Sequence, residues 1–115
     1  MVAYQYEDLG GISGVVENAA KPYSKRSRDH DRFQNFHFQC DPAQPFTGVV
    51  HIQGSLSDPQ KTLADTKWAD IAQLTFTNEG GNSFLQIEVE LASVRVVCKQ
   101  GNYTSGRIIS IQTMR

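Results

Sequence analysis

The sequence predicts an all-β protein: an antiparallel β-sandwich of jelly-roll type, preceded by an extended N-terminal arm. From Phe33 onward, apolar and polar residues alternate along six segments, which is the period of strands with one buried face. No segment sustains the 3.6-residue period of an amphipathic helix. Because two sheets with one apolar face each can bury those faces against one another, the pattern indicates a sandwich.

Residues 1–32 are expected to form the arm, and residues 33–115 the sandwich domain. Residues 1–20 hold three acidic and no basic residues, whereas residues 21–32 hold five basic and two acidic residues. The arm also carries apolar anchors that a purely solvating tail seldom contains, although a loosely attached tail is the alternative. We predict that the arm binds a neighbouring protein subunit. Its expected contacts are Tyr4, Tyr6, Leu9, Ile12, Lys25, Arg26 and Arg28.

The first three strands of the sandwich are predicted from short alternating runs. Phe36, Phe38 and Cys40 alternate with polar residues until residues 41–45, which read DPAQP, break the run. A second strand is expected at residues 49–56. After a polar loop at residues 57–67, a third strand is expected at residues 68–77, followed by a hairpin connection at residues 78–82.

The last third of the chain gives the clearest alternation. Residues 85–91 read LQIEVEL, so one face of this strand is apolar and the other carries Glu88 and Glu90. The next strand, at residues 92–99, carries Arg95 and Lys99 on its polar side, where unlike charges would stabilise pairing of the two strands. We therefore interpret Glu88, Glu90 and Arg95 as a sheet face that contacts protein. After a loop at residues 100–106, residues 107–113 form the last predicted strand.

No motif for catalysis, metal binding or cofactor binding occurs in the sequence. The three histidines lack zinc-site spacing, although His37 and His51 would be neighbours if their strands pair. Cys40 and Cys98 share strand faces with apolar residues, as buried free cysteines do. The separation of Glu88 and Glu90 would suit a glycosidase pair, but a solvated or interface face explains them better. We expect no enzyme activity and no cofactor.

The overall charge also excludes classes of partner. With 11 basic and 12 acidic residues, the net charge is −1, so the chain is not a polyelectrolyte binder of nucleic acid. The basic stretch at residues 21–32, flanked by aromatic residues that could stack on bases, is interrupted by two aspartates and favours a protein contact. No apolar run approaches membrane-helix length and no signal peptide begins the chain, so we expect a soluble protein made in a cytoplasm.

Two aromatic residues suggest carbohydrate binding as an alternative function. Trp68 and Tyr103 lie beside predicted loops and could form a platform for stacking a sugar ring. Closing the end of the sandwich core is the structural interpretation of Trp68, and we favour it.

A series of short sequence motifs follows in a fixed order over about residues 47–113. Residues 51–56 read HIQGSL, followed by Asp58-Pro59 and by WADI at residues 68–71. The chain closes with ASVRVV at residues 92–97 and NYTSGRIISI at residues 102–111. This order resembles small β-sandwich structural proteins of tailed-bacteriophage virions, in which a "GSL…P…W" unit precedes "VRV…TSGxI".

The resemblance implies a virion structural protein, made in the host cytoplasm, whose partners are other virion proteins and copies of itself. It implies that Trp68 and the turn Thr104-Ser105-Gly106 determine the fold and take no part in an active site. The position in the virion (head decoration, neck, baseplate or fibre) stays open. A carbohydrate-binding module of a host-recognition fibre is the alternative.

Overall fold

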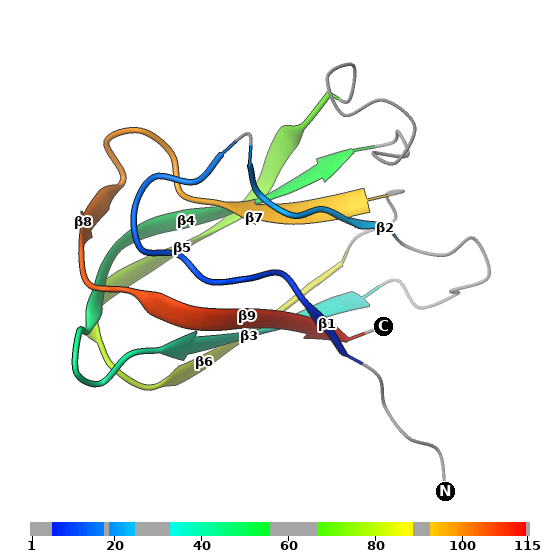
Figure 1. Ribbon diagram of the computed structural model, residues 1–115. Coiled ribbons are helices and arrows are strands. Elements are labelled where there is room, and N and C mark those ends of the chain that lie inside the picture. Colours follow the sequence, from blue (N-terminus) through cyan, green and yellow to red (C-terminus); the bar gives the residue numbers. More distant parts are fainter. Residues whose placement is uncertain (1–5, 18, 25–32, 56–66, 89–92, 115) are drawn as a thin grey trace, which may run out of the picture.

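The computed structural model describes residues 6–17, 19–24, 33–55, 67–88 and 93–114. Within these ranges, every element of regular secondary structure is a β-strand. The strands form two antiparallel sheets that pack against each other (Figure 1). The predicted all-β class and the packing of two antiparallel sheets are therefore confirmed. Each of the six predicted strands has its counterpart, with shifted ends, among the nine observed strands.

The first sheet has four strands in the order β1-β9-β3-β6. Their bounds are Tyr6–Asp8 for β1, Ile108–Met114 for β9, Phe33–Cys40 for β3 and Asn82–Glu88 for β6. The second sheet has the order β2-β7-β4-β5, with β8 paired to β4. Their bounds are Tyr23–Ser24 for β2, Ser93–Val97 for β7, Phe46–Ser55 for β4, Ala69–Glu79 for β5 and Tyr103–Ser105 for β8.

The core lies between the two sheets and is built mainly from every second residue of the long strands. Phe36 and Phe38 of β3 face Phe46 of β4 and Phe76 of β5, and all four side chains are buried. The ring centroids of Phe38 and Phe76 are 5.7 Å apart, and those of Phe46 and Phe76 are 5.5 Å apart. These contacts explain the alternation in the sequence, because a strand in this position exposes only one face to the core.

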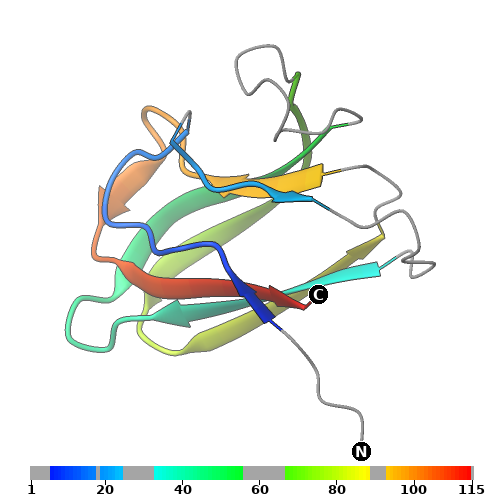
Figure 2. The same cartoon turned by 45° about the vertical axis from the view of Figure 1, so that its right-hand side comes forward.

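The described part of the N-terminal segment belongs to the sandwich. β1 pairs with β9, and β2 pairs with β7, so the segment crosses from the edge of one sheet to the edge of the other (Figure 2). Between these strands, the N–H of Ile12 donates to the carbonyl of Ile108 at 2.9 Å and the N–H of Val16 to that of Cys98 at 2.8 Å. The chain thus covers one lateral edge of its own sandwich.

Two predicted subunit contacts are consequently wrong. Leu9 is 8% exposed and Ile12 is 2% exposed, and both pack in the core of their own chain. Their apolar side chains are therefore explained by burial in the core of the same chain. A separate N-terminal arm is not confirmed, and Tyr4, Lys25, Arg26 and Arg28 lie outside the described residues.

The predicted pairing of the two late strands is also wrong. β6 pairs with β3, with Phe33 opposite Glu88, whereas β7 pairs with β4 and β2 in the other sheet. Arg95 therefore does not lie opposite Glu88. His37 of β3 and His51 of β4 are likewise separated, because their strands belong to different sheets.

Candidate functional site

The outer face of the four-stranded sheet is the candidate site. Since Phe36 and Phe38 point into the core, the alternate residues of β3 and their cross-strand partners point to solvent. We name this surface the aromatic–amide face after its composition. Its residues are Tyr6, Asp8, Phe33, Asn35, His37, Gln39, Asn82, Phe84, Gln86, Glu88, Ser110 and Gln112.

A stacked pair of rings stands on this face. Phe84 lies opposite His37 in the β3–β6 ladder, with ring centroids 4.5 Å apart and planes 9° apart. Nε2 of His37 is 3.0 Å from Oδ1 of Asn82, which fixes the imidazole ring. Phe84 is nevertheless 76% exposed. The result is an oriented aromatic ring that is open to a partner.

The amide side chains around these rings are also oriented. Gln86 Nε2 donates to Asn35 Oδ1 at 2.9 Å, and Ser110 Oγ donates to Gln39 Oε1 at 3.2 Å. Each bond uses one hydrogen-bonding position of an amide that has two N–H donors and an accepting oxygen. These amides are therefore held in place while retaining capacity for further hydrogen bonds.

The composition of the face resembles the average composition of protein interfaces. It carries the acidic residues Asp8 and Glu88, and none of its residues is lysine or arginine. Tyr6 is 59% exposed and Phe33 is 44% exposed. Protein interfaces are enriched in aromatic residues and depleted in lysine, and exposed apolar patches commonly mark contact sites.

The structure brings together some of the residues that the sequence predicted as interface residues. Tyr6 and Glu88, taken from separate predicted surfaces, share the aromatic–amide face. Glu90 lies outside the described residues. Phe84 was not predicted as an interface residue, although one signal was available: Phe84 is in phase with Gln86 and Glu88, on the polar side of its strand.

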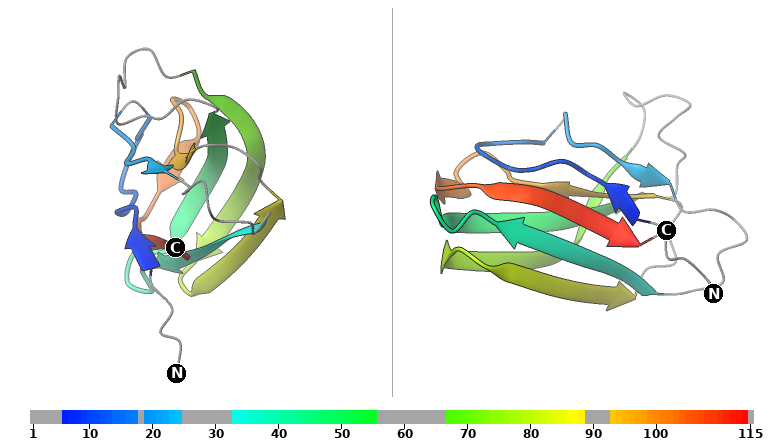
Figure 3. Two further views of the ribbon diagram at one scale, coloured as in Figure 1. Left: turned by 90° about the vertical axis from the view of Figure 1, so that its right-hand side faces the viewer. Right: turned by 60° about the horizontal axis from the view of Figure 1, so that its bottom comes forward.

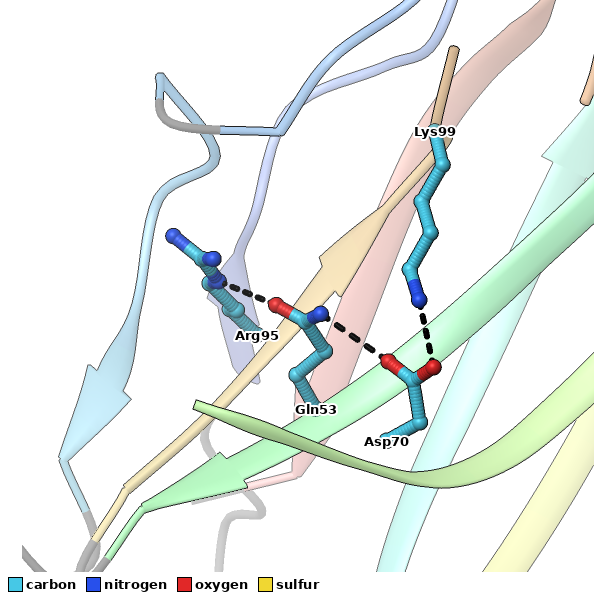
Figure 4. Close-up of polar contacts among 4 residues, drawn as sticks. All are labelled: Gln53, Asp70, Arg95 and Lys99. Atoms are coloured by element: carbon cyan, nitrogen blue, oxygen red, sulfur yellow. Dashed lines mark hydrogen bonds and ion pairs between the residues drawn. The ribbon is translucent and has the colours of Figure 1, made fainter. Parts of the chain in front are cut away.

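Arg95 is part of a network within the chain, so its predicted role at an exposed sheet face is wrong (Figure 4). It is 8% exposed, and its Nε donates to Gln53 Oε1 at 2.8 Å. Gln53 Nε2 in turn donates to Asp70 at 2.9 Å, and Asp70 pairs with Lys99. Burial lowers the pKa of Arg95, and the charge of Glu17 opposes this effect. The network joins β4, β5 and the β7 segment.

The predicted glycan platform of Trp68 and Tyr103 is not assembled. The Trp68 ring lies 4.5 Å from the guanidinium carbon of Arg95. Tyr103 donates from its hydroxyl to the carbonyl of Gly106 at 2.8 Å and pairs with Gly48. The residue after Trp68 pairs with Gly54, six positions along β4, so the two aromatic residues are separated by about 20 Å of strand.

Two aspartates give the protein a predictable acid sensitivity. The hydrogen bonds from Arg107 at 2.7 Å and from the N–H of Ala43 at 2.8 Å hold the pKa of Asp41 below its usual range. Lys99 and Gln53 do the same for Asp70. A carboxyl whose pKa is lower in the folded state stabilises the fold above its unfolded pKa, and this stability is lost as the pH falls through the folded value.

We therefore expect the free energy of unfolding to decrease as the pH falls below about 4. The Asp41→Asn and Asp70→Asn variants should show a shallower decrease, because each lacks one of the groups that titrate. Urea denaturation at a series of pH values measures the slopes. Equal slopes for the wild type and both variants would rule out this account.

The cysteines and the cavity offer little for catalysis. Burial raises the pKa of the Cys40 thiol to about 11, with a further contribution from Glu79, and burial also raises the pKa of Cys98. A cavity of about 460 Å³ beneath the N-terminal segment is lined mainly by apolar residues, together with Asp8 and Lys21. Lys21 is already bonded to the carbonyl of Asp8 at 3.1 Å and paired with Glu7 at 3.3 Å.

No cluster of three or more His, Cys, Asp or Glu side chains in the described residues could hold a metal ion. The described part of the chain also contains no helix of the length and apolarity needed to cross a bilayer. No family model, curated protein or solved structure matches the chain.

Proposed function

We propose that this protein is a non-enzymatic structural component of a tailed-bacteriophage virion. It binds in many copies and stabilises or links parts of the particle, as a capsid decoration, neck or tail protein. Its partners are other virion proteins and copies of itself, and it reaches the virion from the host cytoplasm. The order of the sequence motifs at residues 47–113 supports this proposal through resemblance.

The strand order supports the finer assignment of a jelly roll. The sheets β1-β9-β3-β6 and β2-β7-β4-β5 have the interleaved order of an eight-stranded jelly roll, with β8 as an addition to β4. In this assignment, the N-terminal segment supplies the first strand of each sheet. Viral capsid domains and lectins both use this architecture, so the fold alone favours either role.

The aromatic–amide face is the observation that carries the proposal. A virion protein acts by being bound, and this face offers oriented rings and amides with no lysine or arginine among its residues. In the proposed particle, the face docks on the surface of a neighbouring protein, with Phe84 at the centre of the contact. A non-enzymatic role agrees with the raised thiol pKa values and the mostly apolar cavity.

Phe84→Ser tests this role. We expect the variant to fold and to bind particles at least about tenfold more weakly, because a central aromatic residue commonly dominates an interface. Val15→Ser, at another exposed apolar position, is the matched control and should bind like the wild type. Binding is measured by adding each purified protein to particles that lack it. Equal binding of Phe84→Ser and the wild type would contradict docking through this face.

A carbohydrate-binding role is the second candidate, and the His37–Phe84 pair favours it. An exposed ring beside oriented amides is also suited to stacking and hydrogen bonding of a neutral sugar. A glycan array separates the two candidates. Binding that is lost in Phe84→Ser would favour the carbohydrate role, whereas no binding, together with loss of particle integrity when the protein is absent, would favour the structural role.

A further inference from the structure

The two lateral edges of the sandwich differ. At one edge, the N-terminal segment covers β9 and β7 through β1 and β2. At the opposite edge, β5 and β6 end their sheets, as the end-on view shows (Figure 3). Among the described strands, β5 pairs only with β4. A long open edge of this kind is a template for pairing with another strand.

The central part of β5 is regular and lacks the usual protection of edge strands. Register shifts at both ends of the β4–β5 ladder leave an uninterrupted stretch from Ala72 to Phe76. This stretch reads AQLTF and contains no charge, proline or glycine. Natural sheets commonly protect exposed edges with lysine, proline or charged side chains. The register shifts at the two ends confine the available edge to this stretch.

The direction of the backbone groups along this stretch follows from a neighbouring bond. The N–H of Val49 donates to the carbonyl of Asn102 at 2.9 Å, so Val49 directs its N–H and C=O away from β5. Val49 lies opposite Thr75. These directions alternate along an antiparallel ladder. The backbone N–H and C=O of Leu74 therefore point to β4, whereas those of Gln73 and Thr75 point to the open edge.

We propose that β5 pairs with β5 of a second copy, antiparallel, about a twofold axis at Leu74. In this register Gln73 of one copy lies opposite Thr75 of the other, so both residues with outward backbone groups exchange hydrogen bonds. Ala72 lies opposite Phe76, a small side chain against a large one, and Leu74 lies opposite itself. The dimer contains one continuous sheet across both copies.

The occupant is a second copy because the stretch is self-complementary. No like charges meet in the paired stretch, and the amide of Gln73 lies beside the hydroxyl of Thr75 on the outer face. Ala72 and Leu74 are half-buried at the edge of the core. In the dimer, the inner face of the second copy covers them further. A twofold contact of this kind uses the same surface on both chains and closes the assembly.

The test is the mass of the full-length chain, measured by light scattering at concentrations up to about 100 µM, since a short strand pairing gives a weak dimer. We expect the wild type to reach twice the mass of the chain. Thr75→Pro removes an outward N–H without removing a bond to β4, so this variant should stay monomeric while keeping its circular dichroism spectrum. Thr75→Val keeps the N–H and should still form the dimer.

A pair of double variants tests the register and does not depend on proline. Gln73→Lys with Thr75→Lys places like charges opposite one another and should give a monomer. Gln73→Lys with Thr75→Glu places unlike charges opposite one another and should restore the dimer. A monomeric wild type at every concentration, or an oligomer unaffected by the first double variant, would overturn the proposal. These measurements use no virion, so their outcome is independent of the proposed function.

Discussion

Replacing Gly106 by alanine should destabilise the fold by about 3 kcal/mol or more, because two costs coincide at this position. Gly106 has a φ of +77°, in the region that favours glycine. A Cβ atom at Gly106 would lie 1.8 Å from the carbonyl oxygen of Pro45 and 2.4 Å from its carbonyl carbon. Both are backbone atoms, so neither can move aside as a flexible side chain would.

Gly101→Ala is the matched control for this prediction. Gly101 also has a positive φ, +86°, but no atom lies within 4 Å of the position of its Cβ. Only the backbone cost remains, and we expect a loss of about 1 kcal/mol. Urea denaturation of both variants gives the two free energies. If the two losses were equal, the close approach of Pro45 would not be the reason for glycine at position 106.

Ile12→Ala should destabilise the protein by about 2–4 kcal/mol, because it leaves a cavity in the core. Ile12 is 2% exposed, and its backbone forms two hydrogen bonds with Ile108. Val15→Ala, at a residue that is 48% exposed in the same segment, is the control and should cost less than about 0.5 kcal/mol.

This comparison decides whether the N-terminal segment is part of the folded body. A separate arm would tolerate both substitutions equally, since its side chains would not contribute to the stability of the sandwich. Similar unfolding midpoints for Ile12→Ala, Val15→Ala and the wild type would therefore contradict the structure.

The alternation of apolar residues was sufficient to predict the six long strands, because each of them buries one face in the core. The pairing of strands could not be predicted in the same way. Leu85 and Val94 both belong to apolar faces, and nothing in their alternation shows that β6 and β7 lie in different sheets. As a result, the charge pairing predicted between Glu88 and Arg95 was wrong.

The pairing of the N-terminal strands with the sandwich was missed for a different reason. β1 has three residues and β2 has two, too few to display a period of two. Their positions are fixed by pairing with β9 and β7, and these contacts connect residues that are far apart in the sequence. The apolar character of Leu9 and Ile12 was recognised, but the sequence did not show which chain they contact.

The candidate site was predictable only in part. Tyr6 and Glu88 were predicted as interface residues, and they share the aromatic–amide face because β1 and β6 are the two edges of one sheet. The stack of His37 and Phe84 depends on the register of β3 and β6, which is set by the whole fold. The separation of Trp68 from Tyr103 likewise follows from their pairing along β4.

The number of copies of this protein per purified virion tests the central claim most directly. Quantitative mass spectrometry of virions whose genome encodes the chain gives this number relative to the major capsid protein. The proposed function predicts many copies in every particle, in a fixed ratio to the capsid protein. Abundant protein in infected cells, together with its absence from the purified particles, would contradict a structural role in the virion.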